Sequence, residues 1–112
     1  LATCAGMILL ADKLEADSKV HLQTIPMTVK RNAYGRQLGS FHTKATIKGI
    51  GEVPMTFIRA PYVSQVSNEV EILSVVEERI VAVRYQKQIV LAFHPELDND
   101  LRIHEMFLSL CN

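Results

Sequence analysis

The sequence has few of the features that would assign a function directly. Its 112 residues include two cysteines and no tryptophan, and twelve acidic residues balance twelve basic ones. A net charge of zero gives no electrostatic attraction to nucleic acid or to an anionic membrane surface. No apolar run reaches the roughly 20 residues that cross a bilayer, and no signal peptide is visible. We therefore expect a cytoplasmic protein that binds neither nucleic acid nor membrane.

The two cysteines, Cys4 and Cys111, lie at opposite ends of the chain. Such a pair is either a disulfide or two unrelated thiols, and nothing in the sequence indicates an oxidising compartment, so we expect two thiols. No two histidines have the close spacing of a zinc site, so we expect no metal. We also expect no cofactor. A chain of this length and 48% hydrophobic content buries one core, which predicts a single domain over residues 1–112.

The region around Cys4 has the composition of a nucleophile elbow, the sharp strand-to-helix turn that exposes a catalytic side chain. Small residues flank the cysteine, and the apolar run Met7–Leu10 follows. Small flanks permit the turn, and the N-terminus of the following helix favours the thiolate form of the cysteine. The alternative is a buried, inert cysteine.

A base and an orienting carboxylate occur near the other end of the chain. His94 and Glu96 are two residues apart, so on extended backbone their side chains point to the same side. Glu96 can then fix the imidazole tautomer while the other ring nitrogen of His94 faces the sulfur of Cys4. The sequence therefore predicts a catalytic triad of Cys4, His94 and Glu96.

The remaining pattern predicts an α/β domain, with antiparallel hairpins added to a sheet that helices cover. Residues 4–13 suit a helix, residues 15–23 a loop, and residues 32–35 and 49–54 turns. Strands are expected over residues 28–30, 39–47, 55–59, 70–76, 80–85 and 88–93, with tight turns at 77–78 and 86–87. The acidic cluster at 98–100 suits the N-cap of a last helix. One face of that helix is expected to carry Leu101, Phe107, Leu108 and Cys111.

The same residues carry a family resemblance. The Ala-Thr-Cys-Ala-Gly elbow, together with Phe-His-Pro-Glu-Leu, resembles class I glutamine amidotransferases. The stretches Arg31–Gln37, Ser40–Phe41, Phe57–Pro61 and Asn99–Arg102 narrow the resemblance to the glutaminase subunits of bacterial pyridoxal 5′-phosphate synthase. The resemblance covers essentially all 112 residues.

This resemblance implies a flavodoxin-like α/β fold, which is a three-layer sandwich. It also implies that the protein hydrolyses L-glutamine to L-glutamate and ammonia. The ammonia passes to a synthase subunit, a (β/α)₈ barrel, in a hetero-oligomer that makes pyridoxal phosphate. By motif match, Cys4 forms the glutamyl thioester, His94 is the general base and acid, and Glu96 orients His94.

Four further residues match positions of the family that hold the substrate. Arg31 matches a glutamine-contacting arginine, and Ile58 and Arg59 match a glutamine-binding pair. The backbone N–H of Ala5 corresponds to a donor for the oxyanion, which acyl chemistry of this kind needs.

The chain departs from the family pattern in two places. Ala2 stands where the family usually has glycine, and its methyl group strains the elbow if that position needs a positive φ. The family also carries a Gly-Gly-Glu-Ser segment well before the elbow, which has no counterpart here. We therefore expect residues 1–112 to be the C-terminal portion of a glutamine amidotransferase domain, without the N-terminal strands and helices.

Three hypotheses about function remain open from the sequence. The first is an active glutaminase that supplies pyridoxal phosphate synthesis. The second is a truncated, catalytically incompetent fragment or a non-catalytic homologue that keeps the motif without turnover. The third is a class I amidotransferase that supplies ammonia to another acceptor, which the stretch Arg31–Gln37 disfavours.

Overall fold

The computed structural model describes residues 1–3, 11–14, 25–30, 40–58, 61–98 and 100–110, and the statements below concern these residues. In chain order the elements are β1 (Ala2–Thr3), β2 (Ala11–Leu14), β3 (Ile25–Lys30), β4 (Ser40–Ile47), β5 (Gly51–Ile58), β6 (Tyr62–Val66), β7 (Glu71–Val76), β8 (Arg79–Tyr85), β9 (Gln88–Leu91), the 3₁₀ turn η1 (Pro95–Leu97) and the helix α2 (Arg102–Leu110).

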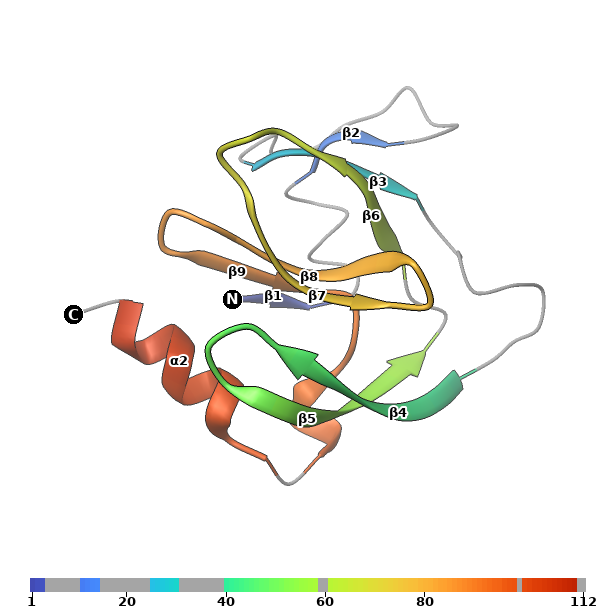
Figure 1. Cartoon of the computed structure of the whole chain (residues 1–112), viewed down its shortest axis with the longest axis vertical. Coiled ribbons are helices and arrows are strands. Elements are labelled where there is room, and N and C mark those ends of the chain that lie inside the picture. Colours follow the sequence, from blue (N-terminus) through green and yellow to red (C-terminus); the bar gives the residue numbers. More distant parts are fainter. Residues whose placement is uncertain (4–10, 15–24, 31–39, 59–60, 99, 111–112) are drawn as a thin grey trace.

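Seven of these strands form one mixed sheet (Figure 1). Their order is β1-β9-β8-β6-β3-β2, and β7 pairs with β8 outside this path. The pairs β1–β9 and β2–β3 are parallel, whereas the other pairs of the sheet are antiparallel. The predicted combination of a sheet with antiparallel hairpins is therefore present in the described residues.

Strands β4 and β5 form a separate antiparallel hairpin that packs against this sheet (Figure 1). Val53, Met55 and Phe57 alternate along β5 and are at most 1% exposed, so this face of the hairpin belongs to the main core. At the hairpin turn, the backbone N–H of Lys48 donates a 2.9 Å hydrogen bond to the carbonyl oxygen of Leu73 in β7. The hairpin is thus attached to the sheet by both apolar packing and a backbone bond.

The predicted C-terminal helix is present as α2, but its apolar face differs from the expected one. Four apolar side chains with helical spacing contact the core: Ile103, Met106, Phe107 and Leu110. Leu101 and Leu108 are 66% and 61% exposed, so the prediction was wrong for these two and right for Phe107. Cys111 lies outside the described residues. The helix has two apolar stripes in its sequence, and only packing against the sheet selects one.

The expected helix over residues 4–13 is wrong at its C-terminal end. Ala11–Leu14 form strand β2, which pairs in parallel with β3, with Leu14 opposite Val29. Pairing with β3 satisfies backbone groups of β2 that the sequence alone would assign to helical hydrogen bonds. Residues 4–10, the loop expected at 15–23 and the turn expected at 32–35 lie outside the described residues.

The other strand predictions hold with shifted ends, and β6 and η1 were not predicted. The tight turns at 77–78 and 86–87 are confirmed, with positive φ angles at Glu77, Glu78 and Gln86. The turn expected over 49–54 is shorter, because β5 already begins at Gly51 and includes Pro54. Among the described strands β5 pairs only with β4, so its other edge can accommodate a proline, which has no N–H for a ladder hydrogen bond.

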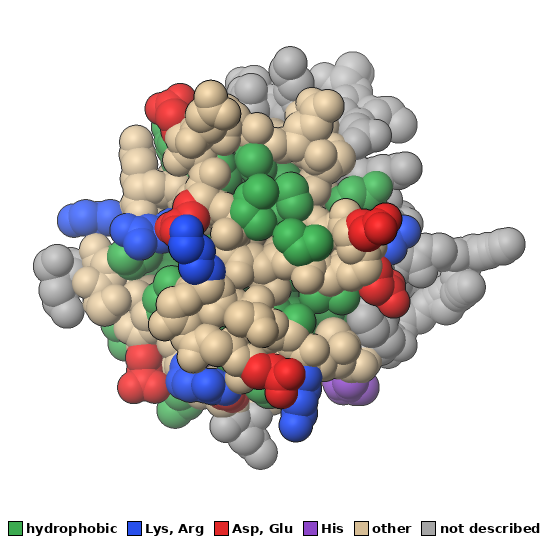
Figure 2. Space-filling view, in the orientation of Figure 1, with side chains coloured by type: hydrophobic (Ala, Val, Ile, Leu, Met, Phe, Trp, Pro, Cys, Tyr) green, Lys and Arg blue, Asp and Glu red, His purple; other side chains and the backbone are tan. Residues whose placement is uncertain are grey.

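The surface mixes charges of both signs. Figure 2 shows acidic and basic side chains interspersed around one face, with apolar side chains near its centre. Ile72 and Val75 of β7 are 41% and 51% exposed. Glu71 of β7 forms ion pairs with two of these basic side chains, Lys48 after β4 at 2.8 Å and Arg84 of β8 at 4.0 Å. In the described part of the chain, no helix combines the length and hydropathy needed to cross a bilayer.

Candidate active site

Parallel pairing of β1 with β9 determines where the two halves of the predicted triad leave the sheet. Ala2 lies opposite Val90, and Thr3 lies opposite Leu91. Parallel neighbours end at the same edge of a sheet. The residue that precedes Cys4 and the strand that leads to His94 therefore end side by side. Cys4 and Ala5 themselves lie outside the described residues.

The backbone of His94 is held from both sides. Ala92 and Phe93, which follow β9, are fully buried, and the ring of Phe93 contacts the ring of Phe57 edge-on at 5.6 Å between centroids. The backbone N–H of His94 donates a 2.8 Å hydrogen bond to the carbonyl oxygen of Thr56 in β5. Its carbonyl oxygen accepts a 3.2 Å hydrogen bond from the N–H of Leu97. His94 thus occupies a fixed place at the end of the sheet.

The segment after His94 is a 3₁₀ turn, Pro95–Leu97. Proline suits its first position, because no intrahelical acceptor exists for an N–H there. The N–H of Asp98 donates to the carbonyl oxygen of Pro95 at 3.1 Å and completes the turn. The expectation that His94 and Glu96 lie on extended chain is therefore wrong for Glu96, whose backbone is helical. The described structure does not cover the Glu96 side chain.

A side-chain network joins this turn to the β4–β5 hairpin. The hydroxyl of Thr56 donates a 3.0 Å hydrogen bond to Oδ2 of Asp98, and Nδ1 of His42 lies 2.9 Å from the same hydroxyl oxygen. A hydroxyl has one proton, and here Asp98 accepts it. In the remaining contact Nδ1 of His42 must therefore carry the proton and donate a hydrogen bond to the hydroxyl oxygen of Thr56.

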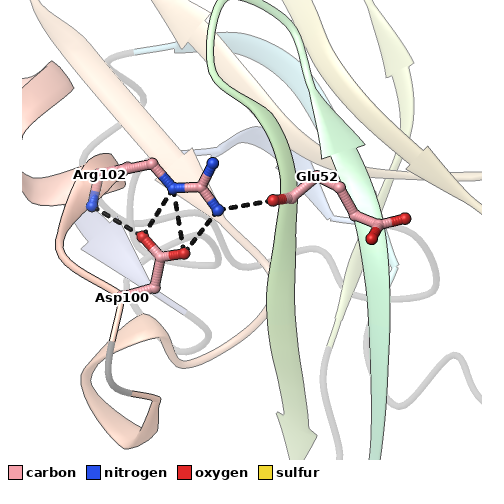
Figure 3. A network of polar contacts seen from close by, with 3 residues as sticks. All are labelled: Glu52, Asp100 and Arg102. Carbon is pink, nitrogen blue, oxygen red and sulfur yellow. Dashed lines mark hydrogen bonds and ion pairs between the residues drawn. The ribbon is translucent and has the colours of Figure 1, made fainter.

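A second polar network anchors the end of the same loop (Figure 3). Arg102 donates to both carboxylate oxygens of Asp100, and its Nη2 also donates a 2.6 Å hydrogen bond to the carbonyl oxygen of Glu52 in β5. Of the acidic cluster expected at the N-cap, Asp100 lies one residue before that position and accepts the backbone N–H of Arg102, the first helical residue, at 3.0 Å. The hydrogen bonds from Arg102 lower the pKa of the Asp100 carboxyl to about 2.

The predicted glutamine-binding residues fall at the ends of described strands. Ile58 is the last residue of β5 and is 42% exposed, two positions after Thr56. Arg59 follows it, and Arg31 follows the end of β3, but both lie outside the described residues. At the end of β3, Lys30 pairs with Tyr62 of β6, and the next residue of β6, Val63, pairs with Ile80 of β8. This part of β8 lies close to the end of β9. The structure thus brings the end of β5 to His94 directly and the end of β3 only through intervening strands.

The sequence analysis assigned no role to His42 or Thr56 of the first network, and it placed Asp98 only in the acidic cluster expected to cap the last helix. His42 is exposed and hydrogen-bonded to Thr56. Thr56 is 3% exposed. In the sequence, the one sign of its role is a polar residue between the apolar residues Met55 and Phe57. Among the described residues, no cluster of three His, Cys, Asp or Glu side chains suits a metal ion.

The chain is similar in sequence to known proteins of one family. The profile of the SNO glutamine amidotransferase family matches residues 1–112. The chain is 61% identical over 109 residues to the pyridoxal 5′-phosphate synthase subunit PdxT of Desulfitobacterium hafniense, covering 97% of this chain and 55% of that protein. It is 52% identical over 109 residues to the PdxT subunit of Streptococcus pneumoniae, covering 97% of this chain and 56% of that protein.

The fold comparison gives the same result. The structure matches a crystal structure described as a glutamine amidotransferase with a TM-score of 0.91 and 38% sequence identity, covering 96% of this chain and 58% of the other. The predicted fold class, an α/β fold of the glutamine amidotransferase type, is therefore confirmed. The chain spans about half the length of the curated relatives it matches.

Proposed function

The chain belongs to the SNO glutamine amidotransferase family, and from that membership we propose that it carries the triad of a glutaminase. The reaction hydrolyses L-glutamine to L-glutamate and ammonia. The observation that supports it is the parallel pairing of β1 with β9, because this pairing ends the strand before Cys4 beside the strand before His94.

The proposed chemistry proceeds through a thioester. His94 takes the proton of the Cys4 thiol, and the sulfur attacks the side-chain amide carbon of glutamine. The backbone N–H of Ala5 donates to the oxyanion that forms. As the carbon–nitrogen bond breaks, the imidazolium of His94 returns the proton to the leaving nitrogen, and ammonia departs.

Water then completes the hydrolysis. His94 removes a proton from a water molecule, whose oxygen attacks the thioester carbon, and the thiol of Cys4 is released with that proton. Glu96 holds the imidazole in the required orientation throughout. Arg31, Ile58 and Arg59 bind glutamine, and the exposure of Ile58 at the end of β5 leaves its side chain accessible to a ligand.

The ammonia has a defined acceptor in this proposal. The PdxT relatives are named as subunits of pyridoxal 5′-phosphate synthase, so we propose that this protein delivers ammonia to the synthase subunit of that enzyme within a hetero-oligomer. We also propose the cytoplasm as the location of the reaction, because thiols stay reduced there.

The test is glutamine hydrolysis, measured as ammonia release by the protein assembled with the synthase subunit. We expect Cys4→Ser to abolish release, because a hydroxyl is a far weaker nucleophile at neutral pH. Cys111→Ser is the matched control and should keep wild-type activity. Undiminished release by Cys4→Ser, or none from the wild-type assembly, would overturn the proposal.

A further inference from the structure

Thr56 is a polar residue in a strand of the core, and its buried hydroxyl lies among polar partners. Its neighbours in β5, Met55 and Phe57, are buried among apolar side chains, yet the hydroxyl of Thr56 is buried on the opposite face of the strand. Burying a hydroxyl costs free energy unless it is hydrogen-bonded, and this hydroxyl has two partners, Asp98 and His42. The site is therefore built around the polar group of Thr56.

Two groups of this one residue hold both ends of the segment that contains the proposed base. The carbonyl oxygen of Thr56 binds the N–H of His94 at 2.8 Å, and its hydroxyl binds the carboxylate of Asp98 at 3.0 Å. Between these two points lies the 3₁₀ turn Pro95–Leu97. A short turn that is fixed at both ends keeps its first residue in one place relative to β5.

We infer that Thr56 is a positioning residue for His94 in the glutaminase reaction, an inference that rests on the proposed function. Strand β5 continues from Thr56 to Ile58, a proposed glutamine contact. The hydrogen bonds of Thr56 thus set the place of the base relative to the place of the substrate. Misplacement of a reacting group by about 1 Å costs on the order of 100-fold in rate.

The hydroxyl of Thr56 can be removed without loss of the fold. Valine has nearly the shape of threonine, so Thr56→Val removes both hydrogen bonds of the hydroxyl and leaves the packing and the backbone bond to His94. Asp98 is only half-buried and His42 is exposed, so water replaces the lost partner of each. We therefore expect the variant to fold.

The experiment compares Thr56→Val, Thr56→Ser and Thr46→Val in the assembled enzyme. Thr46 lies on the neighbouring strand β4 with an exposed side chain and is the matched control. We expect Thr56→Val to lower kcat for glutamine hydrolysis about ten-fold with little change in KM, because of its two lost hydrogen bonds only the one to Asp98 holds the loop of His94. Thr56→Ser restores the hydroxyl and should restore kcat, and Thr46→Val should match the wild type.

A second variant tests whether Asp98 acts through the same contact. Asp98→Leu should lower kcat about as much as Thr56→Val, and the double variant should lose little more than either alone, because residues that share one contact are not additive. Full additivity, an unchanged kcat in Thr56→Val, or failure of Thr56→Ser to restore it would overturn the inference.

Amide hydrogen exchange of His94, followed by NMR, tests the positioning without reference to activity. Loss of the Asp98 anchor should speed exchange at His94 in Thr56→Val and not in Thr56→Ser or Thr46→Val. Unchanged exchange in Thr56→Val would contradict the inference. A wild-type assembly without glutaminase activity would instead overturn the proposed function, and with it the catalytic role of Thr56, whatever the exchange shows.

Discussion

The carbonyl oxygen of Thr56 accepts a 2.8 Å hydrogen bond from the backbone N–H of His94. This bond joins the β4–β5 hairpin to the loop that leaves β9. Two further contacts follow along the same loop, from Asp98 to the hydroxyl of Thr56 and from Arg102 to the carbonyl oxygen of Glu52. The hairpin therefore braces the proposed catalytic loop from His94 to the start of α2.

Substitution of the proposed base and of its orienting carboxylate should have unequal effects. We expect His94→Gln to lower kcat for glutamine hydrolysis at least about a thousand-fold, and Glu96→Gln about a hundred-fold or more, because the carboxylate acts only through the imidazole. His104→Gln, on α2, is the control and should keep kcat. Near-wild-type turnover by His94→Gln would remove His94 from the mechanism.

The two cysteines should differ in reactivity. We expect a chloroketone analogue of glutamine to alkylate Cys4 much faster than Cys111, because the proposed elbow places a helix N-terminus and an imidazole beside Cys4. Mass spectrometry of the labelled peptides gives both rates, and excess glutamine should protect Cys4 alone. Equal labelling of the two thiols would count against Cys4 as the nucleophile.

The apolar face of α2 can be tested with a matched pair of truncations. Ile103 is 3% exposed and Leu108 is 61% exposed on the same helix. We expect Ile103→Ala to lower the free energy of unfolding by about 2–4 kcal/mol and Leu108→Ala by less than about 0.5 kcal/mol. Denaturant titration measures both values. The reverse order would mean that the helix presents the face originally expected from the sequence.

Acid should weaken the anchor between Asp100 and Arg102. The pKa of the folded Asp100 carboxyl is about 2, below its ordinary value of 3.8. The stability that the charged Asp100 carboxylate contributes is therefore fully present above the pKa that this group has in the unfolded chain. That contribution disappears as the pH falls through the folded value of about 2. We expect the melting temperatures of wild type and Asp100→Asn to differ at neutral pH and to converge near pH 2. A constant difference over this range would show that the carboxylate charge contributes nothing.

Local patterns in the sequence were sufficient for the hairpins. The turns at 77–78 and 86–87 and the strands on either side depend on near neighbours in the chain, and the structure has them where expected. The family motifs around Cys4 and His94 were equally local, and they led to the glutamine amidotransferase family that the comparisons show.

Other features depended on partners that are distant in sequence. Ala11–Leu14 form a strand because β3 lies alongside, and α2 turns Ile103 inward because the sheet lies on that side. Residues 11–14 could form either a helix or a strand, and α2 could turn either of its apolar faces inward, so contacts with distant segments select one arrangement.

For this protein, sequence alone determined the family and the local hairpins, and the proposed triad of Cys4, His94 and Glu96 rests on the sequence motifs. Only the tertiary structure decided that β1 ends beside β9 and that Thr56 holds the loop of His94. The physical reason is that hydrogen bonds and buried contacts between distant segments leave no periodic signal in the sequence. A buried threonine among apolar residues is apparent as an anchor only when its partners are seen.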